Sequence, residues 1–138
     1  MGEECIFCKI AKGVLNGHDS SKDDPEGPSG EPDIPIEKIY ENENFFSVFD
    51  IAPQVEGHAL VISKKHFETV LDMPNSLGVE FLDCVKNTSL KLMEEFSADG
   101  FNIVNNTFEC AGQVVNHVHS HILPRKKGDG ELKFVEKN

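Results

Sequence analysis

One stretch decides how this chain folds and what chemistry it carries: residues 117–123, which read His117-Val118-His119-Ser120-His121-Ile122-Leu123. The histidines recur at every second residue, and in a β-strand residues at that spacing share one face. We therefore predict a strand over residues 113–123 that holds three imidazoles in a row. Imidazole titrates near neutrality and ligates metals, so such a row suits nucleophilic attack, proton transfer or metal binding. The alternative is three solvated histidines without a role.

The composition is that of one globular domain without a polyanionic partner. The chain has 138 residues, of which 38% are hydrophobic and 27% are charged, and this length leaves room for a real core. Its formal net charge of −11 repels polyanions, so neither nucleic acid nor an anionic membrane is an expected partner. A small phosphorylated ligand needs only a few local donors. No apolar run reaches the length of a membrane span.

The four cysteines are expected to be reduced. Residues 1–5 show no basic region and no apolar stretch of a secretory signal, so we expect a cytoplasmic or nuclear protein. Cys84 lies in a helical pattern and is expected in the core, and Cys110 is expected in a loop. Cys5 and Cys8 have a spacing that suits zinc, but a pair of buried thiols is the alternative. A closed zinc site needs two more ligands, for which His66 and the three histidines are the best candidates.

The predicted elements give an α+β protein. Strands are expected over residues 36–40, 45–51, 59–62, 101–105 and 113–123, with a hairpin break at 41–44. A short helix is expected over residues 5–12, stopped by Gly13, and a helical turn is expected to open at Lys64, before Pro74. One long helix is expected from Asn75 or Ser76 to Gly100, with an apolar stripe made of Leu77, Phe81, Leu82, Val85, Leu92, Met93 and Phe96. This order predicts an antiparallel sheet with the long helix across one face.

Residues 16–35 differ in composition from the rest of the chain. They hold four of the seven prolines and many acidic residues, so they have too few apolar groups to pack. We predict an acidic loop that acts as a spacer.

Two further signals lie outside the histidine stretch. Gly112 and Gln113 offer a close backbone approach and an amide that can donate to phosphate oxygens. Asp50 follows an apolar strand, where its carboxylate can accept from two ribose hydroxyls or can cap a turn.

Several motifs, in order, resemble those of the histidine triad (HIT) superfamily, whose signature is His-φ-His-φ-His-φ-φ with φ apolar. The matching segments are Cys5-Ile-Phe-Cys-Lys-Ile, Phe49-Asp-Ile-Ala-Pro-Gln, Glu56-Gly-His-Ala-Leu-Val-Ile, Lys64-Lys-His, Gly100-Phe-Asn-Ile-Val-Asn-Asn, Ala111-Gly-Gln and His117-Val-His-Ser-His-Ile. They cover nearly the whole chain outside residues 16–35 and resemble the Hint or protein-kinase-C-interacting-protein branch most. The resemblance implies a single HIT domain over residues 1–138 and a homodimer whose two sheets join into one.

The resemblance also implies a hydrolase that acts on the α-phosphate of purine nucleoside phosphoramidates or related nucleotidyl conjugates. His119 would be the nucleophile that forms a covalent nucleotidyl intermediate. Its attacking nitrogen must be free, so its other nitrogen should donate to a backbone carbonyl. His121 would hold phosphate oxygens or assist the leaving group, His117 completes the triad, and His58 matches a fourth histidine of the family. The implied nucleoside monophosphate pocket comprises Ile6, Phe7, Phe49 and Ile51 around the base, Asp50 at the ribose, and Asn106, Gly112 and Gln113 at the phosphate, with His119 and His121.

Zinc-binding members of the family imply a ligand set. Carried onto this chain, the ligands are Cys5, Cys8, His66 and His117. A zinc ion there would be structural and would tie the N-terminal helix to the sheet.

Two positions depart from the family pattern. Ser120 stands where the signature has an apolar residue, and because it faces away from the histidines we expect an effect on packing and none on catalysis. Val114 stands where animal Hint proteins carry a serine that contacts the leaving group, which bears on phosphoramidase activity. Two other functions remain open: a dinucleoside polyphosphate hydrolase like the Fhit branch, and a non-catalytic, zinc-stapled module that binds nucleotides or a partner.

Overall fold

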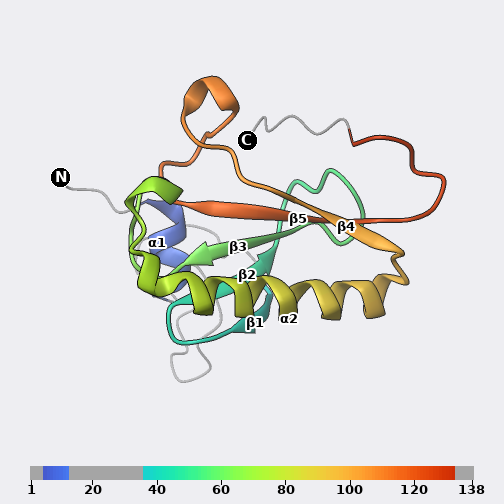
Figure 1. Cartoon of the computed structure of the whole chain (residues 1–138), viewed down its shortest axis with the longest axis horizontal. Helices are drawn as coiled ribbons and strands as arrows, with labels where there is room; N and C mark the ends of the chain where they lie inside the picture. Colours follow the sequence, from blue (N-terminus) through green and yellow to red (C-terminus); the bar gives the residue numbers. More distant parts are fainter. Residues whose placement is uncertain (1–4, 13–35, 133–138) are drawn as a thin grey trace, which may run out of the picture.

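The computed structural model describes residues 5–12 and 36–132, which form an antiparallel five-stranded sheet with a helix on each face (Figure 1). The sheet has the strand order β1-β2-β3-β5-β4. Its strands are β1 (Lys38–Glu41), β2 (Phe45–Phe49), β3 (Ala59–Ser63), β4 (Gly100–Val104) and β5 (His119–Arg125). The helices are α1 (Ile6–Ala11) and α2 (Gly78–Phe96). The predicted α+β class is confirmed, whereas Gly13 and the acidic loop at residues 16–35 lie outside the described residues.

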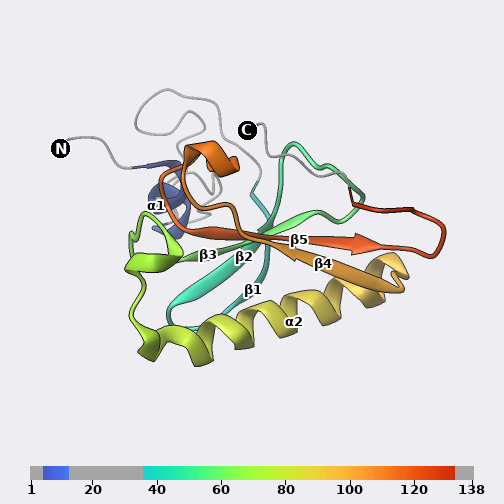
Figure 2. The same cartoon turned by 45° about the horizontal axis from the view of Figure 1, so that its top comes forward.

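The sheet separates two hydrophobic cores, and Figure 2 shows it between α1 and α2. Alternate side chains of a strand point to opposite faces, so β2 and β3 supply both cores. On the α2 side the buried cluster consists of Phe45, Ala59, Val61, Cys84, Val85, Leu92 and Ile122. On the α1 side it consists of Phe7, Ile10, Phe46, Val48, Leu60 and Ile62. Cys84 is in the core as predicted, and Cys110 is exposed.

The long helix is shorter at both ends than the sequence predicts. Residues Asn75–Leu77 form a separate 3-10 turn, and α2 begins at Gly78. The helix ends because Ser97 adopts a left-handed conformation with φ 54° and its N–H bonds to the Met93 carbonyl. Gly100, the predicted stop, instead begins β4. Leu82, predicted in the apolar stripe, is 54% exposed, whereas Thr88 is buried and donates to Ser47 Oγ.

The histidine strand begins later and ends later than predicted. Residues 113–118 are irregular, and β5 runs from His119 to Arg125, so Pro124 lies within the strand. Pro124 pairs with Phe101 of β4, but the neighbouring Arg125 carbonyl accepts from Asp99 on that side, so the Pro124 nitrogen faces the β3 side. β3 begins at Ala59, opposite Ile122, so the missing N–H of Pro124 costs no ladder bond. The other predicted strand ends agree with the structure to within two residues.

Short turns connect the remaining elements. The helical turn predicted from Lys64 lies at Val70–Asp72, where the Thr69 side chain accepts from the Leu71 N–H. A third 3-10 turn, Glu109–Ala111, occupies the predicted loop before the histidines. Within residues 5–12 and 36–132, no helix has the length and hydrophobicity that a membrane crossing requires.

Candidate functional site

His117, His119 and His121, called the histidine row below, lie buried on the α1 side of the sheet. Each is at most 5% exposed. The ring centroids of His119 and His121 are 5.2 Å apart, and the Phe7 ring of α1 meets those of His119 and His117 edge to face at 4.9 Å and 5.8 Å. The three imidazoles therefore share one side as predicted, although His117 precedes β5.

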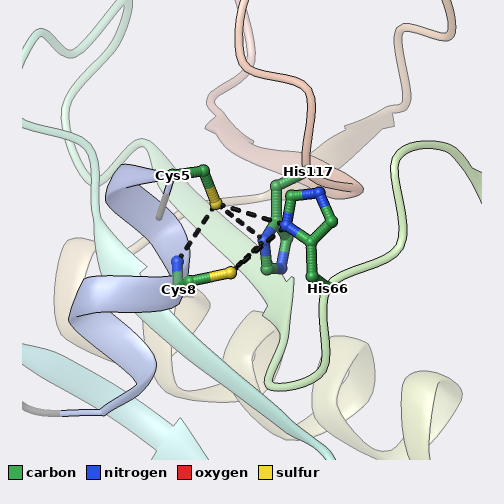
Figure 3. A group of neighbouring side chains, drawn as sticks. All are labelled: Cys5, Cys8, His66 and His117. Atoms are coloured by element: carbon green, nitrogen blue, oxygen red, sulfur yellow. Dashed lines mark hydrogen bonds between the residues drawn. The ribbon is translucent and has the colours of Figure 1, made fainter. Parts of the chain in front are cut away.

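Four side chains converge at the His117 end of the row: Cys5, Cys8, His66 and His117, the Cys2His2 cluster (Figure 3). They come from the start of α1, the segment after β3 and the segment before β5. Cys5 Sγ lies 3.1 Å from His117 Nδ1 and 3.5 Å from His66 Nδ1. Cys8 Sγ lies 3.5 Å and 3.2 Å from the same two nitrogens. In a tetrahedral zinc site, bonds of about 2.3 Å to sulfur and about 2.0 Å to nitrogen place these atoms about 3.5 Å apart. The donor set and spacing therefore fit zinc.

The surroundings of His117 fix the nitrogen that faces the cysteines. His117 Nε2 donates to the Ser63 carbonyl at 2.8 Å and lies 3.1 Å from Ser63 Oγ, whose own hydroxyl donates to the Lys65 carbonyl. The lone pair is thus on Nδ1, as a metal ligand requires, and such support of a ligating imidazole is typical of metal sites. Burial lowers the pKa of His117 to about 4, so the ring is neutral at physiological pH.

His119 is held by the backbone of its neighbour in the row. Its Nδ1 donates to the His117 carbonyl at 2.7 Å, which is the contact that a nucleophilic Nε2 needs. With the hydrogen on Nδ1, the lone pair of the neutral ring is on Nε2.

A hydrogen-bonded relay fixes His121. The Gln54 N–H donates to His58 Nδ1 at 3.0 Å, so the hydrogen of a neutral His58 is on Nε2. His58 Nε2 lies 2.9 Å from His121 Nδ1 and 3.5 Å from Asp50 Oδ2. His121 Nδ1 is then the acceptor, and its hydrogen is on Nε2. These three side chains also have the spacing of metal ligands, but a donor nitrogen on His58 cannot ligate, so we interpret them as a relay.

An apolar cavity of about 290 Å³ opens beside the histidine row. Seven of the predicted nucleotide-binding residues line it: Ile6, Phe7, Phe49, Asp50, Ile51, His119 and His121. Ile10, Ile36, Val48, Ala52, Leu60 and Val115 complete the wall. Asp50 also accepts from the Ala52 N–H at 2.9 Å, so it caps a turn as well as facing the cavity. The size and apolar wall suit a planar base, with polar groups gathered at one end.

Three predicted phosphate-side residues do not line this cavity: Asn106, Gly112 and Gln113. Gln113 is a loop clamp, because its Nε2 donates to the Glu68 and Val115 carbonyls and its Oε1 accepts from the Phe108 N–H. Its own N–H bonds to the Phe108 carbonyl, so none of its donors is left for a phosphate. The clamp holds Phe108 at φ 75°, a conformation unusual for a non-glycine residue. Val114 is half exposed and also lies outside the cavity wall.

Sequence reasoning missed Asn105, Ser63 and the Gln54 backbone. Asn105 Nδ2 lies 3.1 Å from both the His119 carbonyl and Ser120 Oγ. Its position directly after the edge strand β4 is the available signal, but the family resemblance points to the neighbouring Asn106. Asn106 Nδ2 is buried, with no hydrogen-bond partner in the part of the chain that the structure describes.

Comparison with known proteins identifies the family. The HIT domain model matches residues 31–128. The chain belongs to the HIT domain family. An uncharacterized HIT-like protein of Methanocaldococcus jannaschii is 42% identical over 133 residues, which cover 96% of this chain and 88% of that protein. An adenosine 5'-monophosphoramidase of Candida albicans is 34% identical over 126 residues, which cover 88% of this chain and 70% of that protein. The crystal structure of a zinc-bound histidine triad family protein from Mycobacterium smegmatis has a TM-score of 0.73 and 31% identity, and the match covers 98% of this chain and 84% of that chain.

Proposed function

We propose that this HIT protein hydrolyses purine nucleoside phosphoramidates or related nucleotidyl conjugates at the α-phosphate. The observation that carries the proposal is the placement of His119: its Nδ1 is bonded to the His117 carbonyl, and its ring lines the apolar cavity. The relative named as an adenosine 5'-monophosphoramidase supports this substrate class.

The proposed reaction has two steps. The His119 Nε2 lone pair attacks the α-phosphorus, the bond from phosphorus to the leaving nitrogen breaks, and a nucleotidyl-imidazole forms. His121 Nε2–H donates to the leaving nitrogen, while the His58 Nε2–H keeps the His121 ring in the required tautomer. Water then attacks phosphorus and gives a proton to Nε2 of His121, which replaces the proton that went to the leaving nitrogen. The bond from phosphorus to His119 Nε2 breaks, and the nucleoside monophosphate is released. Asp50 would hold the ribose hydroxyls, and the aliphatic and aromatic side chains of the cavity would enclose the base.

The experiment is turnover of adenosine phosphoramidate and of diadenosine polyphosphate by the wild-type protein and His119→Ala. We expect hydrolysis of the phosphoramidate that is lost in the variant. Faster hydrolysis of the diadenosine compound would favour the Fhit-like alternative. Nucleotide binding without turnover of either compound would favour the non-catalytic module.

We also propose a structural zinc ion bound by Cys5, Cys8, His66 and His117. The convergence of their donor atoms and the zinc-bound relative support it. When bound, the ion would supply a fixed link between the start of α1 and the segment before β5. Elemental analysis of protein purified without chelator should find close to one zinc per chain, and finding none would refute the site.

A homodimer is the assembly that we propose. β4 is an edge strand, and its Phe101 and Ile103 are 38% and 52% exposed, an arrangement that invites pairing with a second chain. Two-fold pairing would continue the sheet, and Leu82 and Leu90 of α2 add exposed apolar surface. Ile103→Asp should dissociate the dimer in light scattering and weaken activity. A monomer mass for the wild-type protein at micromolar concentration would contradict the assembly.

A further inference from the structure

Ser120 carries the one polar side chain that interrupts the apolar pattern within the histidine stretch, and it faces the α2 side of the sheet. Its cross-strand partner is Val61, which belongs to the core on the α2 side, and Ser120 is 2% exposed. A buried hydroxyl is costly unless it is hydrogen-bonded. Its hydroxyl oxygen accepts from Asn105 Nδ2 at 3.1 Å.

Asn105 links this hydroxyl to the backbone of His119. The same Nδ2 lies 3.1 Å from the His119 carbonyl, and Thr107 Oγ1 donates to Asn105 Oδ1 at 2.8 Å. The His119 carbonyl settles which end of the amide faces β5, because a carbonyl oxygen only accepts and therefore needs the NH2 group of Asn105.

The contact occurs where the sheet no longer supports the nucleophile on one side. The β4 ladder ends at the Val104–His121 pair, whereas on the other side β3 pairs as far as Ile62–His119. His119 is the first residue of β5 and follows an irregular segment. The Asn105 side chain therefore takes the place that a β4 backbone donor would have.

We propose that Ser120 and Asn105 are positioning residues, which together fix the backbone of His119 while the His117 carbonyl fixes its ring. This inference rests on the proposed nucleophilic role of His119. In-line attack on phosphorus depends on the direction of the Nε2 lone pair, and a displacement of about 1 Å can cost about 100-fold in rate. Neither residue lines the cavity, so loss of the contact should lower kcat and leave KM unchanged.

The test compares substitutions in one cross-strand row. Ser47, Val61 and Ser120 are neighbours across β2, β3 and β5, and Ser47 is a buried serine whose hydroxyl bonds to Thr88. Ser120→Ala should lower kcat for adenosine phosphoramidate about three- to tenfold, and Asn105→Ala, which removes both contacts, should lower it further. Ser120→Thr keeps the hydroxyl and should therefore retain most of the wild-type kcat. The matched control Ser47→Ala should reduce thermal stability without changing kcat.

A second readout does not require turnover. In ¹H–¹⁵N NMR spectra the Nδ1–H of His119 should give a hydrogen-bonded signal that broadens in Asn105→Ala and Ser120→Ala and persists in Ser47→Ala. Asn105 is exposed, so its substitution leaves the core intact if Ser120→Ala folds poorly. Unchanged kcat and an unchanged Nδ1–H signal in Asn105→Ala would overturn the positioning role and leave the proposed function standing. Wild-type protein that turns over no substrate would overturn the proposed function, and the NMR comparison would still decide the positioning.

Discussion

The two ends of the histidine row use the same side chain with opposite tautomers. At His117, Nε2 donates to the Ser63 carbonyl, and Nδ1 presents its lone pair to the two cysteines. At His121, Nδ1 accepts from His58, and the hydrogen is on Nε2. The Ser63 carbonyl sets the tautomer of His117, and the His58 side chain, itself fixed by the Gln54 N–H, sets that of His121. One repeated residue therefore gives a metal-ligand geometry at one end and a proton donor at the other.

His119 stands between these ends, and two contacts connect it to the Cys2His2 end. Its Nδ1 bonds to the carbonyl of His117, and its ring packs against Phe7, which lies between the two cysteines in sequence. The Cys2His2 cluster is therefore connected to the proposed nucleophile through two contacts, although it does not itself line the cavity.

The largest effect is expected from the middle of the row. His119→Ala should lower turnover of a nucleoside phosphoramidate by at least about 1000-fold, because the side chain supplies a bond that exists only during reaction. Mononucleotide affinity, measured by calorimetry, should change only a few-fold. Near-normal turnover in this variant would refute the assignment of the nucleophile.

A smaller effect is expected at the relay end. His58→Phe removes the donor to His121 Nδ1 and should lower kcat about 10- to 100-fold, since general acid catalysis depends on the correct tautomer. Zinc content should not change, because His58 is not in the Cys2His2 cluster. His58→Gln, which keeps a donor group, is the matched control and should retain more activity. Loss of zinc in His58→Phe would show that the two ends are not separate.

The smallest effect on turnover is expected at the metal end. Cys8→Ser should lower zinc content and the thermal midpoint, because metal binding is coupled to ordering of the ligands. Turnover should fall only a few-fold, through loosening of α1 and Phe7. Cys110→Ser changes an exposed cysteine outside the cluster and serves as the control. Equal loss of stability in both variants would argue against a specific metal site.

The sequence predicts the fold better than the irregular segments that complete the site. Near-continuous apolar runs in β2 and β3 give the strand positions directly, because a strand that is buried on both faces needs apolar side chains on both. α2 ends at Ser97, which adopts a left-handed conformation. Glycine is the usual residue in that conformation, so a serine there gives no sequence signal for the helix end. The irregular path of residues 113–118 depends on distant contacts, such as the Val118 N–H to the Phe67 carbonyl. No local pattern reveals such a contact.

The same limit explains the individual site residues. The period of two predicts that the histidines share a side, and the family resemblance supplies the ligand set that the structure brings together. The sequence predicts Gln113 as a phosphate donor, because its side-chain amide carries two N–H groups. Its partners, Glu68 and Phe108, become visible only when the loop is folded.

Identification of the covalent intermediate tests the central claim most directly. The wild-type protein is mixed with adenosine phosphoramidate and quenched in base within one turnover, and its intact mass and peptides are measured. We expect one adenylyl group per active site, attached to His119 and absent from His119→Ala. An adduct on another residue, or a protein that turns over substrate with no adduct at any quench time, would contradict it.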